Sequence, residues 1–152
     1  MAEIRTAHLM TLTLAVAGMQ TIGATPSGNR RIGLVAGGSF TGERLRGTVL
    51  PGGADWIVVR ADGSTTLDVR LVLETDDKSL IGMTYRGMRH GPAAVMERLN
   101  CGDAVDASEY YFRTSVAFET SATKYDWLNR IIAVGTGVRP PEGPVYDIFE
   151  VL

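Results

Sequence analysis

Apolar and polar side chains alternate with a period of two along most of the chain, most clearly in residues 109–120, EYYFRTSVAFET. Successive side chains of a strand point to opposite faces, so this stretch is predicted to be a strand with one apolar and one polar face. The apolar face carries Tyr110, Phe112, Thr114, Val116 and Phe118. The polar face carries Tyr111, Arg113, Ser115, Ala117 and Glu119. Because the polar face mixes small residues with a few hydrogen-bonding groups, we expect it to line the inside of a barrel.

The same alternation predicts eight or nine strands in the whole chain. Besides residues 109–120, they cover residues 5–17, 31–41, 44–50, 56–60, 65–75, 80–89, 125–136 and 145–152. Residues 23–31, GATPSGNRR, predict a mobile loop at the barrel mouth, and the pair Gly37 and Gly38 predicts a bulge or bend. Residues 92–99, PAAVMERL, have helical propensity, so we expect one short helix or an ordered flap there.

Many short strands with glycine- and proline-rich turns favour an all-β fold. We predict a closed antiparallel β-barrel of about eight to nine strands with one short helix or flap, as a single domain over residues 1–152. Closure is favoured because the last strand, VYDIFEVL, can pair with the first. Small barrels either fill their interior with side chains or hold one small ligand.

The composition of the chain argues against several kinds of function. Fifteen basic against seventeen acidic residues give a net charge of -2, so we expect no nucleic-acid partner and no membrane partner. One cysteine, Cys101, excludes an intrachain disulfide, and with only two histidines a zinc site is unfavourable, so we expect neither a metal nor a cofactor. The apolar run in residues 7–19 alternates like a strand and is shorter than the roughly 20 residues of a membrane helix. The expected compartment is the cytoplasm.

Several polar residues could carry chemistry. Asp55 and Trp56 follow a Pro-Gly-Gly turn, where a carboxylate can act as acid or base and an aromatic ring can form a cavity wall. The alternative for Asp55 is capping of backbone amides in the turn. Asp68 and Arg70 share one strand face, as a structural ion pair or as ligand contacts.

Charges inside a barrel need partners from other strands. We expect Arg113 to pair with Asp68 or Asp55, and Glu119 with Arg130 or Arg70. The hydroxyls of three tyrosines could donate to a substrate, with core packing as the alternative role: Tyr85, Tyr111 and Tyr146. Near the end of the chain, Trp127 and Asn129 share a face, where the amide either contacts a ligand or fixes a loop.

Four segments together resemble one known family: GNRRIGLVAGGSFTGERLRGTVLPGGADW, RADGSTTLDVRLVLETDD, EYYFRTSVAFETSATKYDWLNRIIAVGTG and VYDIFEV. They are similar to the uncharacterised protein family 0311, also called domain of unknown function 3237, in motif order and over nearly the whole chain. The resemblance implies a compact antiparallel β-barrel that forms oligomers, and it implies no particular activity. The matched polar positions are Arg31, Asp55, Trp56, Asp68, Arg70, Tyr111, Arg113, Glu119, Trp127, Asn129 and Tyr146.

These observations favour a cofactor-independent enzyme of the isomerase, cyclase or lyase type, acting on an aromatic or polyketide-like molecule held in the barrel. Such reactions need orientation, an acid or base and an anion stabiliser. The base is Asp55 or Glu119, the anion is held by Arg113, and Tyr111 donates a hydrogen bond. The remaining predicted contacts are Trp56, Asp68, Arg70, Tyr85, Trp127, Asn129, Tyr146 and Arg31. The alternatives are a non-catalytic carrier of lipocalin type and a structural oligomer with a solid interior.

Overall fold

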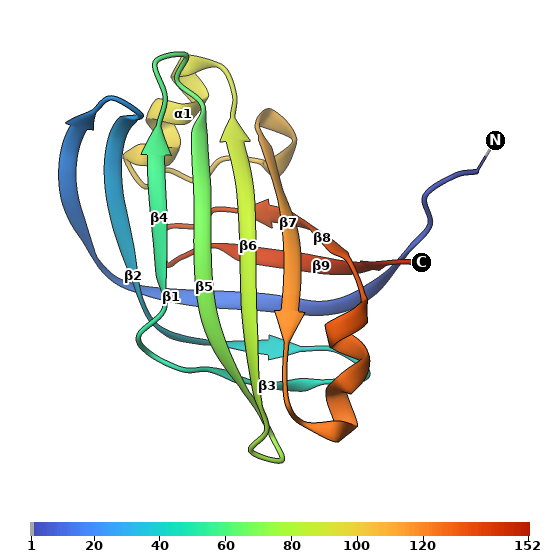
Figure 1. The fold of residues 1–152 in the computed structure, drawn as a ribbon. Helices are drawn as coiled ribbons and strands as arrows, with labels where there is room; N and C mark the ends of the chain where they lie inside the picture. Colours follow the sequence, from blue (N-terminus) through green and yellow to red (C-terminus); the bar gives the residue numbers. More distant parts are fainter. Residues whose placement is uncertain (1) are drawn as a thin grey trace.

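The computed structural model describes residues 2–152, which form nine strands arranged as a barrel-like ring (Figure 1). The strands are β1 (Thr6–Thr25), β2 (Gly28–Thr41), β3 (Arg46–Val49), β4 (Ala54–Val59), β5 (Thr65–Thr75), β6 (Leu80–His90), β7 (Tyr111–Glu119), β8 (Ala133–Val138) and β9 (Val145–Val151). The helical segments are α1 (Ala93–Asn100) and two 3-10 segments, η1 (Ala107–Glu109) and η2 (Thr123–Arg130). None of these segments within residues 2–152 has the length and apolar character of a membrane-crossing helix.

All strand pairings are antiparallel, and they close on themselves. β1 pairs with β9 from Thr6↔Val151 to Thr13↔Val145, and with β2 from Thr11↔Thr41 to Thr25↔Gly28. β3 and β4 share one place in the ring, because both pair with β2 on one side and with β5 on the other. The predicted all-β fold with eight to nine strands, its closure by the first and last strands, and its single short helix are thereby confirmed.

The first hairpin is longer than predicted. The expected loop at residues 23–31 is wrong, because β1 continues to Thr25 and only Pro26 and Ser27 form the turn into β2. The predicted irregularity at Gly37 and Gly38 is confirmed. The register with β1 shifts just beyond this pair, and both glycines have positive φ angles, 155° and 151°. The bulge lets the long hairpin bend around the barrel.

The predicted strand over residues 125–136 is wrong for its first half, which forms the 3-10 segment η2. Tyr125 and Leu128 are the buried residues of this segment. Their spacing of three places them on one side of a helix with three residues per turn. Trp127, predicted on a strand, therefore lies on η2 instead. β8 begins only at Ala133.

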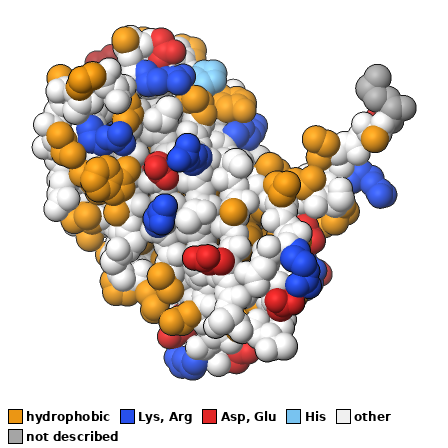
Figure 2. Space-filling view, in the orientation of Figure 1, with side chains coloured by type: hydrophobic (Ala, Val, Ile, Leu, Met, Phe, Trp, Pro, Cys, Tyr) orange, Lys and Arg blue, Asp and Glu red, His pale blue; other side chains and the backbone are white. Residues whose placement is uncertain are grey.

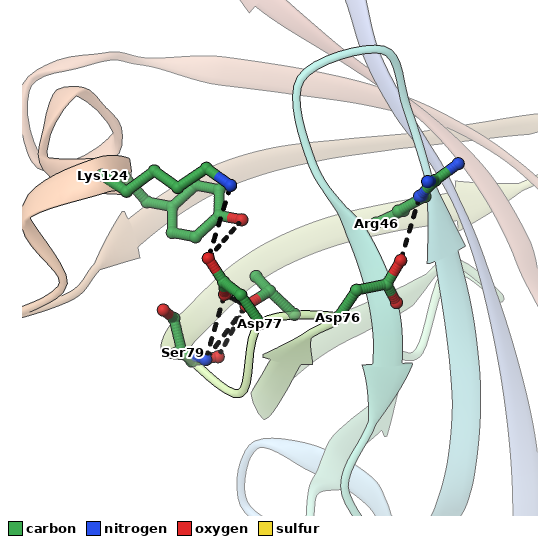
Figure 3. A network of polar contacts seen from close by, with 7 residues as sticks. Arg46, Asp76, Asp77, Ser79 and Lys124 are labelled. Carbon is green, nitrogen blue, oxygen red and sulfur yellow. Dashed lines mark hydrogen bonds and ion pairs between the residues drawn. The ribbon is translucent and has the colours of Figure 1, made fainter.

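The two ends of the barrel are closed differently. At one end, η2 sends Tyr125 and Leu128 into the hydrophobic core. Figure 3 shows how this end is fastened: Asp77, in the β5–β6 turn, accepts hydrogen bonds from Lys124 Nζ and the Tyr125 hydroxyl, each at 3.4 Å. At the other end lies α1 (Figure 1), none of whose residues is buried. The end with η2 is thus sealed by packing, and α1 only covers the other.

The bulge at Gly38 gives a testable prediction. A Cβ there would overlap the carbonyl oxygen of Thr13 on β1, and the φ angle of 151° is one that other residues rarely adopt. We expect Gly38→Ala to lower the free energy of unfolding by about 2–4 kcal/mol, measured by urea denaturation. Gly18→Ala is the matched control on β1, because nothing lies within 4 Å of the added atom. Equal effects of the two changes would contradict the structure.

Candidate functional site

A cavity of about 260 Å³ lies inside the ring at the end covered by α1. The inner faces of seven strands supply its walls, and the end of α1 and the β8–β9 turn supply its rim. Its apolar lining includes Leu14, Val35, Ile57, Leu67, Val69 and Phe112. The barrel interior is therefore not packed solid, which counts against a purely structural role.

Asp55 on β4 brings a carboxylate to this cavity. The Pro-Gly-Gly turn starts β4 so that Asp55 and Ile57 face inward while Trp56 faces outward. One carboxylate oxygen accepts a hydrogen bond from the backbone N–H of Asp68 at 3.1 Å. Burial raises the pKa of Asp55 to about 6, and the N–H of Asp68 and the charge of Arg89 oppose this rise only in part. The carboxyl can therefore exchange a proton close to neutral pH.

Three guanidinium groups line the same cavity: Arg31 on β2, Arg89 on β6 and Arg139 after β8. Arg89 is only 8% exposed, and its guanidinium carbon lies 5.3 Å from the ring centroid of Phe112. Among residues 2–152, the buried Nε atoms of Arg31 and Arg89 have no hydrogen-bond partner. Arg139 donates to the carbonyl of Pro140 at 2.6 Å. Three positive groups thus face one carboxylate.

Two tyrosines complete the polar lining. The rings of Tyr85 and Tyr146 meet edge to face, with 5.1 Å between centroids, and Tyr146 meets Phe112 in the same way at 5.4 Å. Burial raises the pKa of both phenols, so each keeps its proton at neutral pH. The Tyr85 hydroxyl is buried, and within residues 2–152 it makes no hydrogen bond of standard geometry, although the Tyr146 hydroxyl lies close enough to accept from it. The two phenols therefore form a polar pair in the lining of the cavity.

The cavity combines a proton carrier, two phenol donors and an excess of positive charge. These groups suit proton transfer with stabilisation of a developing negative charge on oxygen. Across the described residues 2–152, no three His, Cys, Asp or Glu side chains gather in a way that could hold a metal ion.

Four of the twelve predicted site residues meet in this cavity: Arg31, Asp55, Tyr85 and Tyr146. The other eight lie elsewhere. Sequence analysis missed Arg89 and Arg139. Arg89 could have been found, because it continues the inward alternation of Ile81, Met83 and Tyr85 along β6. Arg139 lies beyond the end of β8, where alternation carries no information.

The prediction that the polar face of β7 lines the inside of the barrel is wrong. Its burial alternates so that Phe112, Thr114 and Val116 point inward, while Tyr111, Arg113 and Glu119 are exposed. A strand between a core and solvent puts its apolar side inward, and here the phenol, guanidinium and carboxylate face water. Figure 2 views this side of the barrel from outside, with charged side chains standing among hydrophobic ones over β4–β7.

The predicted charge pairs of this face do not form either. Arg113 donates to the carbonyl of Phe112 at 2.8 Å and lies over the Tyr111 ring, 5.2 Å from its centroid. Arg130 pairs with Asp126 at 2.7 Å, and it does not pair with Glu119. Being solvated, these charges need no partner from another strand.

Trp56, Asp68 and Arg70 share the outer face of β4 and β5, where they line a shallow surface depression. Trp56 is 48% exposed and lies under the Arg30 guanidinium, 5.8 Å from its ring centroid. The prediction of these three residues inside the barrel is therefore wrong, because the inward positions of β4 and β5 are the alternate ones.

Trp127 and Asn129, the two predicted site residues on η2, contact other parts of the fold and not the cavity. Trp127 packs against the core and lies under Arg44, 3.8 Å from its ring centroid. Asn129 accepts from the N–H of Thr120 at 2.8 Å and donates to the carbonyl of Thr120 at 2.9 Å. Of its two predicted roles, Asn129 takes that of fixing a loop.

Comparison with known proteins places the chain among proteins without an assigned activity. A family model described as "Protein of unknown function (DUF3237)" matches residues 4–151. A UPF0311 protein of Rhodopseudomonas palustris is 34% identical over 149 residues, covering 98% of this chain and 97% of the relative. The crystal structure of the conserved protein of unknown function from this organism has a TM-score of 0.96, at 33% identity over the whole of both chains.

Two further solved structures share the fold. A protein of Acinetobacter baumannii described as "beta-barrel like" has a TM-score of 0.87 at 37% identity, covering 99% of this chain and 98% of its own. A protein of Penicillium herquei described as "an enzyme" has a TM-score of 0.76 at 21% identity, covering 99% of this chain and 96% of its own. The second likeness concerns the fold alone.

The raised pKa of Asp55 predicts a pH effect on stability. Between its ordinary value of 3.8 and about 6, the folded protein binds more protons than the unfolded one. Stability from this group therefore falls as pH rises through that window, by about 3 kcal/mol in all. Asp55→Asn removes this loss. The charged and titratable groups that share the cavity are unchanged in the variant: Arg31, Arg89, Arg139, Tyr85 and Tyr146.

Urea denaturation at pH 4 and pH 7.5 measures the effect. Relative to the wild type, Asp55→Asn should gain about 2.5 kcal/mol between the two pH values, because the carboxyl of the unfolded chain is already partly ionised at pH 4. Asp76→Asn, which removes an exposed carboxylate at the opposite end of the barrel, is the control for the substitution itself. Parallel pH curves for Asp55→Asn and wild type would show that the carboxyl is not desolvated.

Proposed function

Because this chain belongs to the DUF3237 family of proteins of unknown function, we propose its function from the cavity itself: an acid–base enzyme that needs no cofactor. It is of the isomerase, cyclase or lyase type and acts on a small aromatic or polyketide-like molecule. The family resemblance read from the sequence is confirmed by the matches. The observation that carries the proposal is the desolvated carboxylate of Asp55 facing buried polar groups without partners.

Asp55 is the proton carrier in this proposal. A general base works best with a pKa near the operating pH, and a pKa of about 6 leaves Asp55 mostly ionised at pH 7 but easily reprotonated. The carboxylate takes a proton from a C–H next to a carbonyl, the C–H electron pair forms an enolate, and Asp55 returns the proton to another atom. Returned to carbon, the proton completes an isomerisation; loss of a leaving group or closure of a ring gives the other reaction types.

The enolate oxygen needs stabilisation, which the remaining polar lining supplies. We assign this role to the hydroxyl of Tyr85 and the guanidinium of Arg89, which both line the cavity. Donors that are already in place act strongly where water is excluded. Arg113, which sequence analysis assigned to this task, lies outside the barrel, and Arg89 replaces it in the proposal.

Size and lining support an aromatic ligand. A cavity of about 150 Å³ lined by apolar side chains is enough for benzene. The present cavity of about 260 Å³ therefore suits one ring with substituents. Ile57, Leu67 and Phe112 provide apolar and aromatic contacts for the ring.

The cytoplasmic location stays a prediction from the sequence, as do the small-molecule partner and the homo-oligomer.

A carrier of lipocalin type is the second candidate. A carrier predicts that the polar groups of the cavity are paired with one another and that apolar contacts hold the ligand. The unpaired Nε atoms of Arg31 and Arg89 favour the enzyme instead. Turnover, as opposed to binding, decides between the two.

The first test of this proposal follows proton exchange. In D2O, NMR measures replacement of the activated C–H protons of phenylpyruvate, its methyl ester and benzoylacetone. We expect the wild type to accelerate exchange of at least one compound and Asp55→Asn to lose about 100-fold or more of that rate. Asp76→Asn should keep it. If no compound exchanges faster, or if Asp55→Asn exchanges as the wild type does, Asp55 is not the proton carrier.

Tyr85 separates a functional from a structural role. Its hydroxyl is buried and makes no hydrogen bond of standard geometry, with only the Tyr146 hydroxyl close to it, so Tyr85→Phe should change the free energy of unfolding by less than about 1 kcal/mol. The same variant should lower the exchange rate about 10-fold, because a donor to the enolate is lost. Tyr110→Phe is the matched control: its hydroxyl accepts from the N–H of Arg139 at 2.9 Å, and its loss should destabilise. A destabilised Tyr85→Phe with unchanged exchange would reject the donor role.

A further inference from the structure

We propose that the molecule bound in the cavity is an aromatic carboxylic acid, whose carboxylate is held by Arg31 and Arg89. This inference rests on the proposed function insofar as the cavity is a small-molecule site, and it names the class of substrate. The charge of the cavity points to this class. Three guanidinium groups and one carboxylate line it, which leaves a net charge of about two positive units when Asp55 is ionised.

The positive groups are not neutralised by the protein. Within residues 2–152, the ion pairs with nitrogen–oxygen distances up to 4.0 Å involve none of Arg31, Arg89 and Arg139. Arg89 is buried, and its position beside Phe112 offers an aromatic face in place of a carboxylate. A buried cation without a counter-ion is costly, and proteins pair such groups or bind an anion with them.

The three arginines act on one another. Burial lowers the pKa of Arg89, and the nearby charges of Arg139 and Arg31 add to this effect, against opposing contributions from Tyr146 and Asp55. The guanidiniums therefore stand close enough to repel. An anion placed among them removes this repulsion and supplies acceptors for guanidinium N–H groups of Arg31 and Arg89, which both line the cavity.

The rest of the lining selects a carboxylate on an aromatic ring over phosphate. Inorganic phosphate would leave Leu14, Val35, Ile57 and the Phe112 ring facing empty space. A planar carboxylate matches the fork of a guanidinium, and a ring attached to it fills the apolar part of the cavity. Bound in this way, the acid is oriented by its carboxylate, so that another part of the molecule faces Asp55.

Calorimetry with matched pairs of compounds tests this inference: benzoate against benzamide, and cinnamate against cinnamamide, with phenyl phosphate and inorganic phosphate alongside. We expect each acid to bind at least 10-fold more tightly than its amide. Arg89→Gln and Arg31→Gln should each weaken acid binding about 30-fold, as expected for loss of a charged hydrogen-bond partner, and leave amide binding unchanged. Arg86→Gln is the control, an exposed arginine on β6 three positions before Arg89.

Stability measurements show whether weaker acid binding by a variant comes from the lost arginine or from loss of folded protein. Without ligand, Arg89→Gln should be at least as stable as the wild type, because the change removes an unpaired buried charge. Arg89→Lys keeps the charge and loses the fork, and it should bind acids with intermediate affinity. The inference is overturned if amides bind as tightly as acids, if Arg31→Gln and Arg89→Gln bind acids like the wild type, or if phenyl phosphate binds more tightly than benzoate.

The exchange assay separates this inference from the proposed function. If the methyl ester of phenylpyruvate exchanges as fast as the acid and Asp55→Asn abolishes both rates, proton transfer stands and the carboxylate inference fails. If acids bind in an arginine-dependent way and Asp55→Asn leaves exchange unchanged, the carboxylate inference stands and the proton-transfer proposal fails.

Discussion

The pairing of β1 on both of its edges is the constraint on which the rest of this structure depends. β1 is 20 residues long, and residues 11–13 pair with β2 on one side and β9 on the other. This double pairing joins the two ends of the sheet and leaves it without open edges there. A closed sheet has an inside and an outside, and every alternating strand then contributes one side chain in two to a shared interior. Asp55 and Tyr85 lie in one row across β4, β5 and β6, and the curvature of the ring brings Tyr146 on β9 to the same cavity.

Much of the fold could be predicted from the sequence, because period-two alternation and turn residues are local signals. They placed most strands, the bulge at Gly37 and Gly38, and the short helix. The inside of β7 was assigned wrongly although the sequence carried the signal, since the face with Phe112, Val116 and Phe118 is the apolar one and such a face meets the core. The apolar side of β7 faces inward, and the face with Arg113 meets solvent. In η2, the spacing of Tyr125 and Leu128 follows a period of three, which was interpreted as part of a strand.

The candidate site could be predicted less well, for a related reason. Asp55, Tyr85, Tyr146 and Arg31 were recognised as polar residues on strands, but their meeting depends on register across the ring. Arg89 could have been predicted from alternation. It lies on the same face of β6 as Ile81, Met83 and Tyr85, so an arginine among inward-facing apolar positions was the visible signal. For Arg139, which follows β8, only the fold brings the residue to the rim. Buried polar residues in an otherwise apolar series mark functional positions more directly than polar strand faces do.

The helix α1 is only loosely held over one end of the barrel, and this bears on the rates at which a bound molecule would enter and leave. α1 has eight residues, none of them buried, and no side chain caps its first turn. A helix this short is marginal by itself, so α1 is held by partial packing of Val95, Met96 and Leu99 on the core. It can therefore detach while the ring stays intact, at a far lower free energy than global unfolding. For the ligand proposed above, substitutions in α1 are expected to change the rates of entry and exit together, whereas substitutions of the cavity arginines are expected to change chiefly the lifetime of the complex. Under this proposal, chains with the same interior would differ in residence time through this one helix.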